Sequence, residues 1–312
     1  MNREFTAGNL KKAHALIALG IHRTPVLQSH YLNTLSGAQL FFKCENFQKT
    51  GSFKARGALH SVLRLSAKER HFITHSSGNH GQALAWAAAQ AGARATVVMP
   101  RNAPAVKVAA VQHYDGEVVF CEPTLAARQS TMEEIQKQSQ AYFIPPYDHP
   151  LIIEGQSTAA REFLEDYPLQ HLLAPVGGGG LLAGSALAAH FWAPNTQVWA
   201  GEPTGADDAY RSFYGSERIA QHQPQTIADG LLTTLGLLNY AVIKRHVAGI
   251  FCVSDAEIVE AMRLVYERLK IVIEPSCAVP LAAVLKNKVS FKNQRVGIIL
   301  SGGNVDVTHL PF

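Results

Sequence analysis

One lysine stands at the mouth of an expected helix, in the turn Thr50-Gly51-Ser52-Phe53-Lys54-Ala55-Arg56-Gly57-Ala58. The positive end of a helix dipole disfavours a nearby ammonium group and tends to lower its pKa. A lysine that is a free amine near neutral pH can attack the carbon of an aldehyde. Lys54 is therefore a candidate for covalent chemistry, although a solvated surface lysine fits this turn equally well when it is taken alone.

Four consecutive glycines, Gly177–Gly180, follow an apolar strand and open another expected helix. Because glycine has no side chain, the backbone N–H groups at such a helix start can approach an anion closely. The run therefore predicts a phosphate site. It also fits the dinucleotide pattern as Gly178-x-Gly180-x-x-Ala183, with Glu202 near the expected distance downstream. A nicotinamide cofactor is an open alternative for this turn alone.

Two further turns complete the set. Ser76-Ser77-Gly78-Asn79-His80-Gly81 offers hydroxyls, an amide and free N–H groups, which suit a carboxylate, and Ser301-Gly302-Gly303-Asn304 adds a neutral hydroxyl. In open parallel sheets such turns meet at one edge, outside the carboxyl ends of the strands. Together the turns supply a phosphate cradle, an amine, a carboxylate site and a neutral hydrogen-bonding group. Pyridoxal phosphate needs all four, whereas a dehydrogenase has no need for Lys54 and the serine-rich turn.

The elements that must position these turns alternate between strand and helix along the chain. We expect strands at 39–43, 71–75, 95–99, 117–120, 141–144, 171–176, 197–201 and 295–300, and helices at 53–65, 81–91, 105–113, 125–138, 155–167, 181–191, 255–269 and 279–285. Regular alternation of this kind predicts an α/β fold, with parallel sheets covered by helices on both faces. The polar segment Tyr210–Gln225 is expected to be a surface excursion.

The composition narrows the class of protein. A chain of 312 residues is long enough for one large domain or two closely packed ones. The net charge of +4, with no run of Lys or Arg, argues against nucleic acid as a partner. No stretch is apolar enough to cross a membrane, and Met1–Lys12 lacks the apolar core of a signal peptide. The four cysteines share no CxxC spacing, which fits a reduced cytoplasmic protein.

The four turns, with several motifs between them, resemble the fold-type II family of pyridoxal-phosphate enzymes, in the branch of serine/threonine dehydratases and serine racemase. The likeness covers almost the whole chain and is carried by Glu45–Lys54, Ser76–Gln82, Gly155–Thr158, Pro175–Gly180, Glu202-Pro203, Ala206–Asp208, Thr226–Gly230, Glu274–Ser276 and Ser301–Asp306. It implies a fold similar to the tryptophan synthase β subunit, in which two domains each hold a mainly parallel sheet flanked by helices. The large, cofactor-binding domain is expected at 1–68 and 148–312, and the small domain at 69–147.

The resemblance also implies roles for individual residues. Lys54 is expected to bind pyridoxal phosphate as a Schiff base and later to move the proton of the substrate's α-carbon. The expected cofactor-binding residues are Phe53, Lys54, Asn79, Gly177, Gly178, Gly179, Gly180, Glu274 and Ser301. The expected substrate-binding residues are Ser76, Ser77, Gly78, Asn79, His80 and Arg128, with Ser77 also a catalytic acid/base on the face opposite Lys54.

Ser301 bears on the reaction, because a neutral hydroxyl at the pyridine nitrogen stabilises a positive ring less than a carboxylate would. Prompt loss of a β-hydroxyl is then the easier exit. The resemblance therefore favours an ammonia-lyase that dehydrates and deaminates L-serine or L-threonine to a 2-oxo acid and ammonia. Serine racemase activity, in which Ser77 returns the proton, is an alternative or a second activity of the same site. Dehydration of 3-hydroxyaspartate is another alternative, because Arg128 would suit an acidic substrate.

A divalent-cation site is implied at Glu202, the carbonyl of Ala206 and Asp208. Oxygen ligands of this kind suit magnesium, calcium or manganese. The expected partners are a small amino-acid substrate and a second copy of the chain in a homodimer, with no nucleic acid and no membrane.

Overall fold

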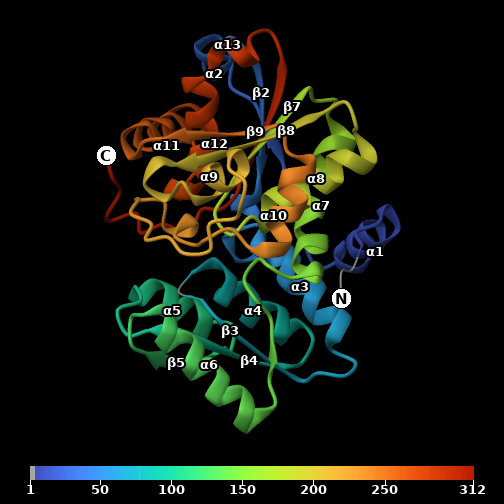
Figure 1. Ribbon diagram of the computed structural model, residues 1–312, viewed down its shortest axis with the longest axis vertical. Coiled ribbons are helices and arrows are strands. Elements are labelled where there is room, and N and C mark those ends of the chain that lie inside the picture. Colours follow the sequence, from blue (N-terminus) through green and yellow to red (C-terminus); the bar gives the residue numbers. More distant parts are fainter. Residues whose placement is uncertain (1–3, 77) are drawn as a thin grey trace.

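The computed structural model describes residues 4–76 and 78–312, which form two sheets stacked along the long axis of the molecule (Figure 1). The larger sheet has six strands in the order β1-β2-β10-β7-β8-β9. Its strands are β1 (Val26–Leu27), β2 (Gln39–Cys44), β10 (Arg295–Leu300), β7 (His171–Pro175), β8 (Gln197–Pro203) and β9 (Gly249–Val253). The neighbours β1 and β2 are antiparallel, and every other neighbouring pair is parallel. The first long strand, β2, therefore pairs with the last, β10.

The smaller sheet has four parallel strands in the order β5-β4-β3-β6. They are β3 (His71–His75), β4 (Arg94–Pro100), β5 (Glu117–Cys121) and β6 (Tyr142–Phe143), all from one continuous stretch of the chain. The chain thus leaves the six-stranded part after α3 (Lys54–Leu65) and returns to it after β6.

Helices cover both faces of each sheet. The remaining helices are α1 (Ala7–Ile17), α2 (His30–Ser36), α4 (Asn79–Gln90), α5 (Ala105–Gln112), α6 (Leu125–Ser139), α7 (Pro150–Asp166), α8 (Gly180–Trp192), α9 (Asp208–Tyr214), α10 (Leu237–His246), α11 (Asp255–Leu269), α12 (Pro275–Lys286) and α13 (Lys288–Phe291). Successive residues of β7 point to opposite faces of the sheet: Leu172 packs in the core with α7 and α8, and Leu173 in the core with α11 and α12. Within the described residues, no helix is long and apolar enough to cross a membrane.

The expected α/β fold is confirmed, and each expected strand and helix is present with its ends shifted by a few residues. The largest shift is at α7, which begins at Pro150 rather than Gly155, because proline suits the first turn of a helix and the His149 ring accepts a hydrogen bond from Leu151 N. The sequence did not indicate β1, β9, α1, α2, α9, α10 or α13. All four cysteines are free thiols.

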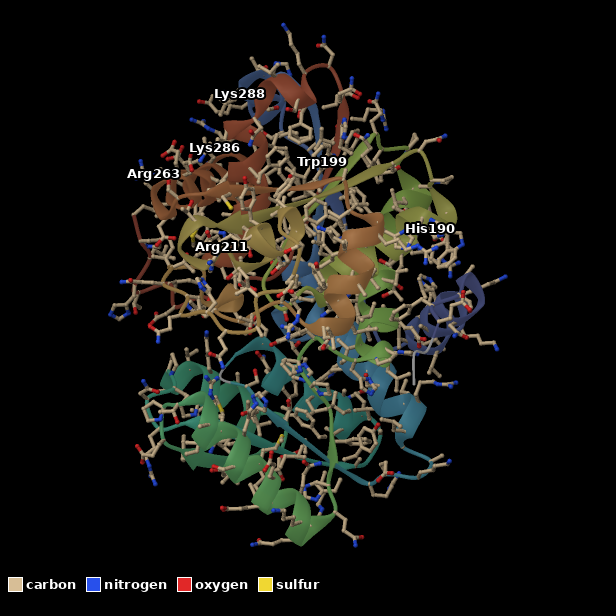
Figure 2. All side chains as sticks on the ribbon, viewed as in Figure 1. His190, Trp199, Arg211, Arg263, Lys286 and Lys288 are labelled. Carbon is tan, nitrogen blue, oxygen red and sulfur yellow. The ribbon has the colours of Figure 1, made fainter. Side chains whose placement is uncertain are left out.

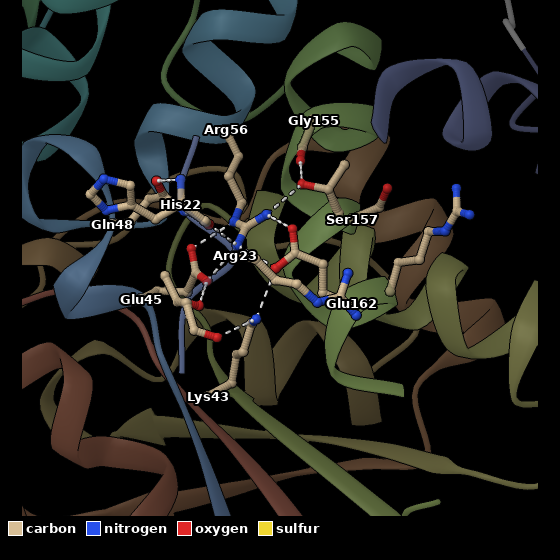
Figure 3. Close-up of polar contacts among 12 residues, drawn as sticks. His22, Arg23, Lys43, Glu45, Gln48, Arg56, Gly155, Ser157 and Glu162 are labelled. Atoms are coloured by element: carbon tan, nitrogen blue, oxygen red, sulfur yellow. Dashed lines mark hydrogen bonds and ion pairs between the residues drawn. The ribbon is translucent and has the colours of Figure 1, made fainter. Parts of the chain in front are cut away.

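A buried ionic cluster fixes α3 against the six-stranded part (Figure 3). Arg56 is fully buried and binds both Glu45, at 2.7 and 2.8 Å, and Glu162, at 2.8 and 2.9 Å. Lys43 Nζ binds Glu162 at 2.8 Å and the carbonyl of Thr24 at 2.9 Å. Burial alone would raise the pKa of Glu162, but Arg56 and then Lys43 outweigh burial and lower that pKa to about 2. Because every charge has a partner, the start of α3 is held in a single position.

Candidate active site

A cavity of about 500 Å³ lies between the six-stranded part and the four-stranded part of the molecule. It gathers the turns that the sequence indicated, which come from both parts of the chain. The expected cofactor and substrate residues that line it are Phe53, Lys54, Ser76, Gly78, Asn79, His80, Arg128, Gly177, Gly178, Gly179, Gly180, Glu274 and Ser301. Ser77, the expected second acid/base, lies outside the described residues.

Lys54 is the first residue of α3, and its position is set by the end of β10. Phe53 N donates to the carbonyl of Ser301 at 3.0 Å, and Ser52 forms a bridge with Gly302. The Lys54 ammonium donates to the carbonyl of Pro146 at 2.6 Å. Burial lowers the pKa of Lys54 to about 8, against an opposing effect of Glu274. The direction agrees with the sequence-based expectation, and burial is the main cause of the lowered pKa.

The glycine run forms a close-fitting loop between β7 and α8. A Cβ on Gly177 would lie 2.9 Å from the Cα of Leu231, and one on Gly178 would lie 2.3 Å from the ring of Tyr147. Gly179 has φ +91°, a conformation that favours glycine. The loop ends at Gly180, the first residue of a 13-residue helix, so free N–H groups and a favourable dipole meet there. The backbone N–H groups of the loop can therefore bind a phosphate at close range.

Several polar side chains gather on the Lys54 side of the cavity. Asn79 Nδ2 donates to both carboxylate oxygens of Glu274, at 2.9 and 3.0 Å, and Asn304 Nδ2 donates to Asn79 Oδ1 at 2.8 Å. Burial, and then Asp229, raise the pKa of Glu274 to about 7, although the bond from Asn79 opposes them. Ser301 is almost fully buried at the end of β10. An acid that titrates near neutral pH and a neutral hydroxyl thus stand close to the amine.

The Ser76–His80 turn sits at the start of α4, above the same cavity. Ser76 Oγ accepts a hydrogen bond from Gly78 N at 3.3 Å. Burial lowers the pKa of His80 to about 3, so the ring is neutral, and its Nε2 donates to the carbonyl of Ile144 at 3.1 Å. That bond uses the ring proton, and among the described residues of the turn the N–H groups of Asn79 and His80 and the Ser76 hydroxyl remain to bind a carboxylate.

The side of the cavity formed by the four-stranded part carries positive charge. Arg128 lies on α6, and its Nε donates to the carbonyl of Thr124 at 3.4 Å. Among the described residues no carboxylate forms an ion pair with Arg128. Burial, and then Arg128, lower the pKa of His75. Lys107, on α5, forms an ion pair across the cavity with Asp229.

The sequence did not single out several residues of the cavity wall. The segment Tyr210–Gln225 was expected to be a surface excursion, and most of its residues are exposed. Its first five residues belong to α9, however, and His222 and Pro224 line the cavity, which the sequence did not indicate. Arg211, on α9 (Figure 2), donates to His222 Nδ1 at 3.1 Å. A polar stretch without periodicity gives no signal for such a contact, because the contact depends on how the chain returns over the sheet.

The expected cation ligands lie outside the cavity lining, at the end of β8 and the start of α9. Glu202 accepts hydrogen bonds from Ala209 N at 2.9 Å and Tyr210 N at 2.6 Å, and Asp208 accepts one from Leu235 N at 2.7 Å. Burial raises the pKa of both acids, and Asp208 further raises that of Glu202. In the part of the chain that the structure describes, no group of three or more His, Cys, Asp or Glu side chains is placed to hold a metal ion.

Known proteins resemble this chain over nearly its full length. Residues 17–302 match the family described as pyridoxal-phosphate dependent enzyme. The chain is 47% identical over 310 residues to a β-hydroxyaspartate dehydratase of Paracoccus denitrificans, covering 98% of each chain. The crystal structure of serine racemase from Dictyostelium discoideum is 46% identical, with a TM-score of 0.92 over 97% of this chain and 99% of that one. The crystal structure of a T.th. threonine deaminase is 42% identical, with a TM-score of 0.92 over the same shares.

Proposed function

The chain belongs to the pyridoxal-phosphate-dependent enzymes, and from that premise we propose that it dehydrates and deaminates L-serine or L-threonine to a 2-oxo acid and ammonia. The observation that carries the proposal is the single cavity lined by Lys54, the glycine loop and the Ser76–His80 turn. A proton-moving amine, a phosphate cradle and a carboxylate site are the parts that this elimination requires.

In this proposal the cofactor is held by Phe53, Lys54, Asn79, Gly177, Gly178, Gly179, Gly180, Glu274 and Ser301. When bound, pyridoxal phosphate supplies an electron sink that makes the α-proton of an amino acid acidic. The fit is supported by the glycine loop, which lines the cavity and ends at Gly180, the first residue of α8, where backbone N–H groups without helical partners suit a phosphate. The neutral Ser301 hydroxyl would leave that sink weak, which favours prompt departure of the β-hydroxyl.

Lys54 is the group proposed to take the α-proton. A pKa of about 8 leaves part of the amine unprotonated near neutral pH, which suits a general base. The turn Ser76, Gly78, Asn79 and His80 would hold the α-carboxylate by backbone N–H groups and the Ser76 hydroxyl. Ser77 would be the acid/base on the opposite face, which would allow serine racemisation as a second activity of the site.

A second candidate substrate is 3-hydroxyaspartate, favoured by the positive charge that Arg128 brings to the cavity without a carboxylate partner among the described residues. A guanidinium can bind a second carboxylate of the substrate by charge-assisted hydrogen bonds. The relative from Paracoccus denitrificans named a β-hydroxyaspartate dehydratase supports this candidate.

Glu202, the carbonyl of Ala206 and Asp208 are proposed to bind a divalent cation. Two buried carboxyls with raised pKa values, without a Lys or Arg ion pair among the described residues, fit a site that a cation completes. Chelation of divalent cations should then lower the unfolding temperature of the protein, and added magnesium should restore it. An unfolding temperature that does not change on chelation would refute the proposed cation site.

The remaining proposals concern organisation. We propose a large domain of residues 1–68 and 148–312 and a small domain of residues 69–147, which agrees with the division into two sheets. We also propose a cytoplasmic homodimer, as the family resemblance implies. Sedimentation of the purified protein would test the dimer, and limited proteolysis near residues 68 and 147 would test the domain boundaries.

Proton NMR in D₂O tests the reaction. The purified protein is mixed with pyridoxal phosphate, magnesium and L-serine, L-threonine or 3-hydroxyaspartate. Pyruvate from L-serine or 2-oxobutyrate from L-threonine is the expected product, and deuterated serine beside pyruvate, identified as D-serine by chiral analysis, would add racemisation. If none of the three substrates changes, the proposed function is wrong.

The choice between neutral and acidic substrates is tested at Arg128. If 3-hydroxyaspartate is the substrate, Arg128→Gln should lower kcat/KM for it by about 10- to 100-fold, because a charge-assisted bond is lost, and should leave L-serine nearly unaffected. Arg101→Gln, at an exposed position, is the matched control. Equal losses for both substrates would mean that Arg128 does not select the side chain.

A further inference from the structure

The segment that leads from β6 to α7 passes between the two sheets beside the cavity (Figure 1). It touches the site at two consecutive residues. The carbonyl of Pro146 accepts the bond from Lys54, and the ring of Tyr147 lies against Gly178 of the glycine loop. The next residue, Asp148, lies outside the cavity lining and has no role in the chemistry described so far.

Asp148 caps the N-terminus of α10. Its carboxylate accepts hydrogen bonds from three successive backbone N–H groups, those of Leu237 and Leu238 at 3.0 Å and that of Asn239 at 3.2 Å. These donors have no partner within the helix, and a negative charge at this end is also favoured by the helix dipole. The approach is close, since a Cβ on Gly236 would lie 2.5 Å from the Cγ of Asp148.

The same turn of α10 holds the glycine loop. The carbonyl of Gly178 accepts one hydrogen bond from Gly236 N at 3.1 Å and another from Asn239 Nδ2 at 2.7 Å. A trans peptide is planar, so a carbonyl fixed toward α10 turns the N–H of Gly179 to the opposite side. The carbonyl of Gly178 therefore sets the direction of an N–H group in the cradle.

We infer that Asp148 is a positioning residue for the phosphate cradle: by fixing the first turn of α10 it holds the carbonyl of Gly178, and so aims the N–H of Gly179 at the phosphate of the cofactor. This inference rests on the proposed cofactor site, but not on which amino acid the enzyme converts. It predicts that Asp148 acts on the phosphate rather than on the ring of the ligand.

The test compares two capping residues in the apoprotein. Asp148→Ala removes the cap of α10, and Ser254→Ala removes the capping box of α11, which lies away from the cavity. Both variants should unfold a few degrees below wild type, because each loses a helix cap. Only Asp148→Ala should raise the Kd for pyridoxal phosphate, by about tenfold or more.

Pyridoxal, which has the same ring and aldehyde but no phosphate, separates the cradle from the rest of the site. Its Kd should stay within about twofold of wild type in Asp148→Ala, because the cradle does not touch it. An equal loss for both ligands would overturn the inference and point to the contact between Pro146 and Lys54. An unchanged Kd for pyridoxal phosphate would reduce Asp148 to a structural cap.

A double-mutant cycle checks the route through α10. Asn239→Ala removes one of the two bonds to the carbonyl of Gly178 and should also weaken pyridoxal phosphate binding. The effect of the double variant should be smaller than the sum of the two single effects, because both act on one peptide. Strict additivity would contradict the route. These are binding measurements, so a wild-type protein that binds the cofactor but converts no hydroxy amino acid would refute the proposed function alone, whereas one that binds no cofactor would refute both.

Discussion

Lys54 and Arg56 lie two residues apart on α3 and belong to two different charged clusters, one in the cavity and one in the interior. The two clusters differ in how their charges are paired. Arg56 has two carboxylate partners and a hydrogen bond to Thr158, whereas Lys54 has one carbonyl partner, on Pro146. Two positions along a helix turn the side-chain direction by about 200°, so one group faces the cavity and the other faces the interior. Burial lowers the pKa of Lys54 to about 8. Burial acts on Arg56 in the same direction, but Glu45 and Glu162 outweigh it and raise its pKa.

The contrast shows what pairing decides. In the ionic cluster, every charge has an oppositely charged neighbour, and these ion pairs lower the pKa of Glu162 to about 2 and raise that of Arg56. In the cavity, Lys54 and Glu274 are buried with too few opposite charges, and both titrate within reach of neutral pH. The ionic cluster around Arg56, two residues from Lys54, helps to hold Lys54 in place beside Glu274.

Removing the cavity charge should have the largest effect on activity. Lys54→Ala should lower turnover of any accepted substrate by more than about 10³-fold, because the proton-moving amine is lost. The unfolding temperature of the apoprotein should stay close to wild type, since Lys54 makes one hydrogen bond. Lys68→Ala, at an exposed position beyond α3, is the control. An active Lys54→Ala protein would contradict the catalytic role of Lys54 and thus the contrast with Arg56.

Removing the paired charge should act on stability instead. Arg56→Met should cost about 3–5 kcal/mol of unfolding free energy, because Glu45 and Glu162 are left buried without their cation. Urea unfolding of the apoprotein measures this. A loss below about 1 kcal/mol would mean that water or rearrangement compensates the acids easily, and the cluster would not hold the start of α3 in a single position.

The pH dependence of stability separates the clusters further. The pKa of Glu274 is raised to about 7, above its value in the unfolded chain, so the folded protein holds this proton longer and stability declines as pH rises from about 4.5 to 7. Glu274→Gln, which cannot ionise, should therefore be more stable than wild-type apoprotein at pH 8, by up to about 3 kcal/mol, and equal to it near pH 4.

Glu162 should behave in the reverse sense. Its pKa is lowered to about 2, so its contribution is complete above the unfolded value and is lost as pH falls from about 4.5 toward 2. Unfolding curves from pH 3 to 8 would display both slopes. If Glu274→Gln is no more stable than wild type at pH 8, the negative charge of Glu274 is stabilised by its neighbours more strongly than its contacts indicate.

The smallest effect is expected at the edge of the ionic cluster. Thr158 Oγ1 accepts a bond from Arg56 at 3.1 Å and donates to the carbonyl of Gly155 at 2.7 Å. Thr158→Val keeps the shape but loses both bonds, and should cost about 1–2 kcal/mol in urea unfolding. The Kd for pyridoxal phosphate should not change. A clear change in that Kd would show that the two clusters are coupled through α3.

The sequence predicted those features that depend on local chain geometry. Three of the four turns directly follow β3, β7 and β10, and the fourth, which carries Lys54, lies between β2 and α3. The rule for parallel sheets brings such ends together. The lowered pKa of Lys54 was predicted in direction, but the responsible burial depends on both sheets closing over the amine. The start of a helix can be predicted from the sequence of one turn, whereas the burial of a side chain depends on segments far away in the sequence.

The missed features depend on long-range contacts. His222 and Tyr147 reach the cavity from segments without periodicity, and α10 was not indicated, because its pattern is weakly amphipathic. Asp148 caps a helix that begins nearly ninety residues later. Capping is visible in a sequence only when the cap precedes its own helix, as Ser254 does for α11.

The pairing of β2 with β10 has a consequence for synthesis on the ribosome. Gln39 is paired with Arg295, 256 positions later, so β2 emerges long before the strand that will cover its edge. The four-stranded sheet is encoded in one uninterrupted stretch and can close while translation continues. Until β10 arrives, this edge of β2 lacks its strand partner, so truncated products of this chain should aggregate more readily than the complete protein.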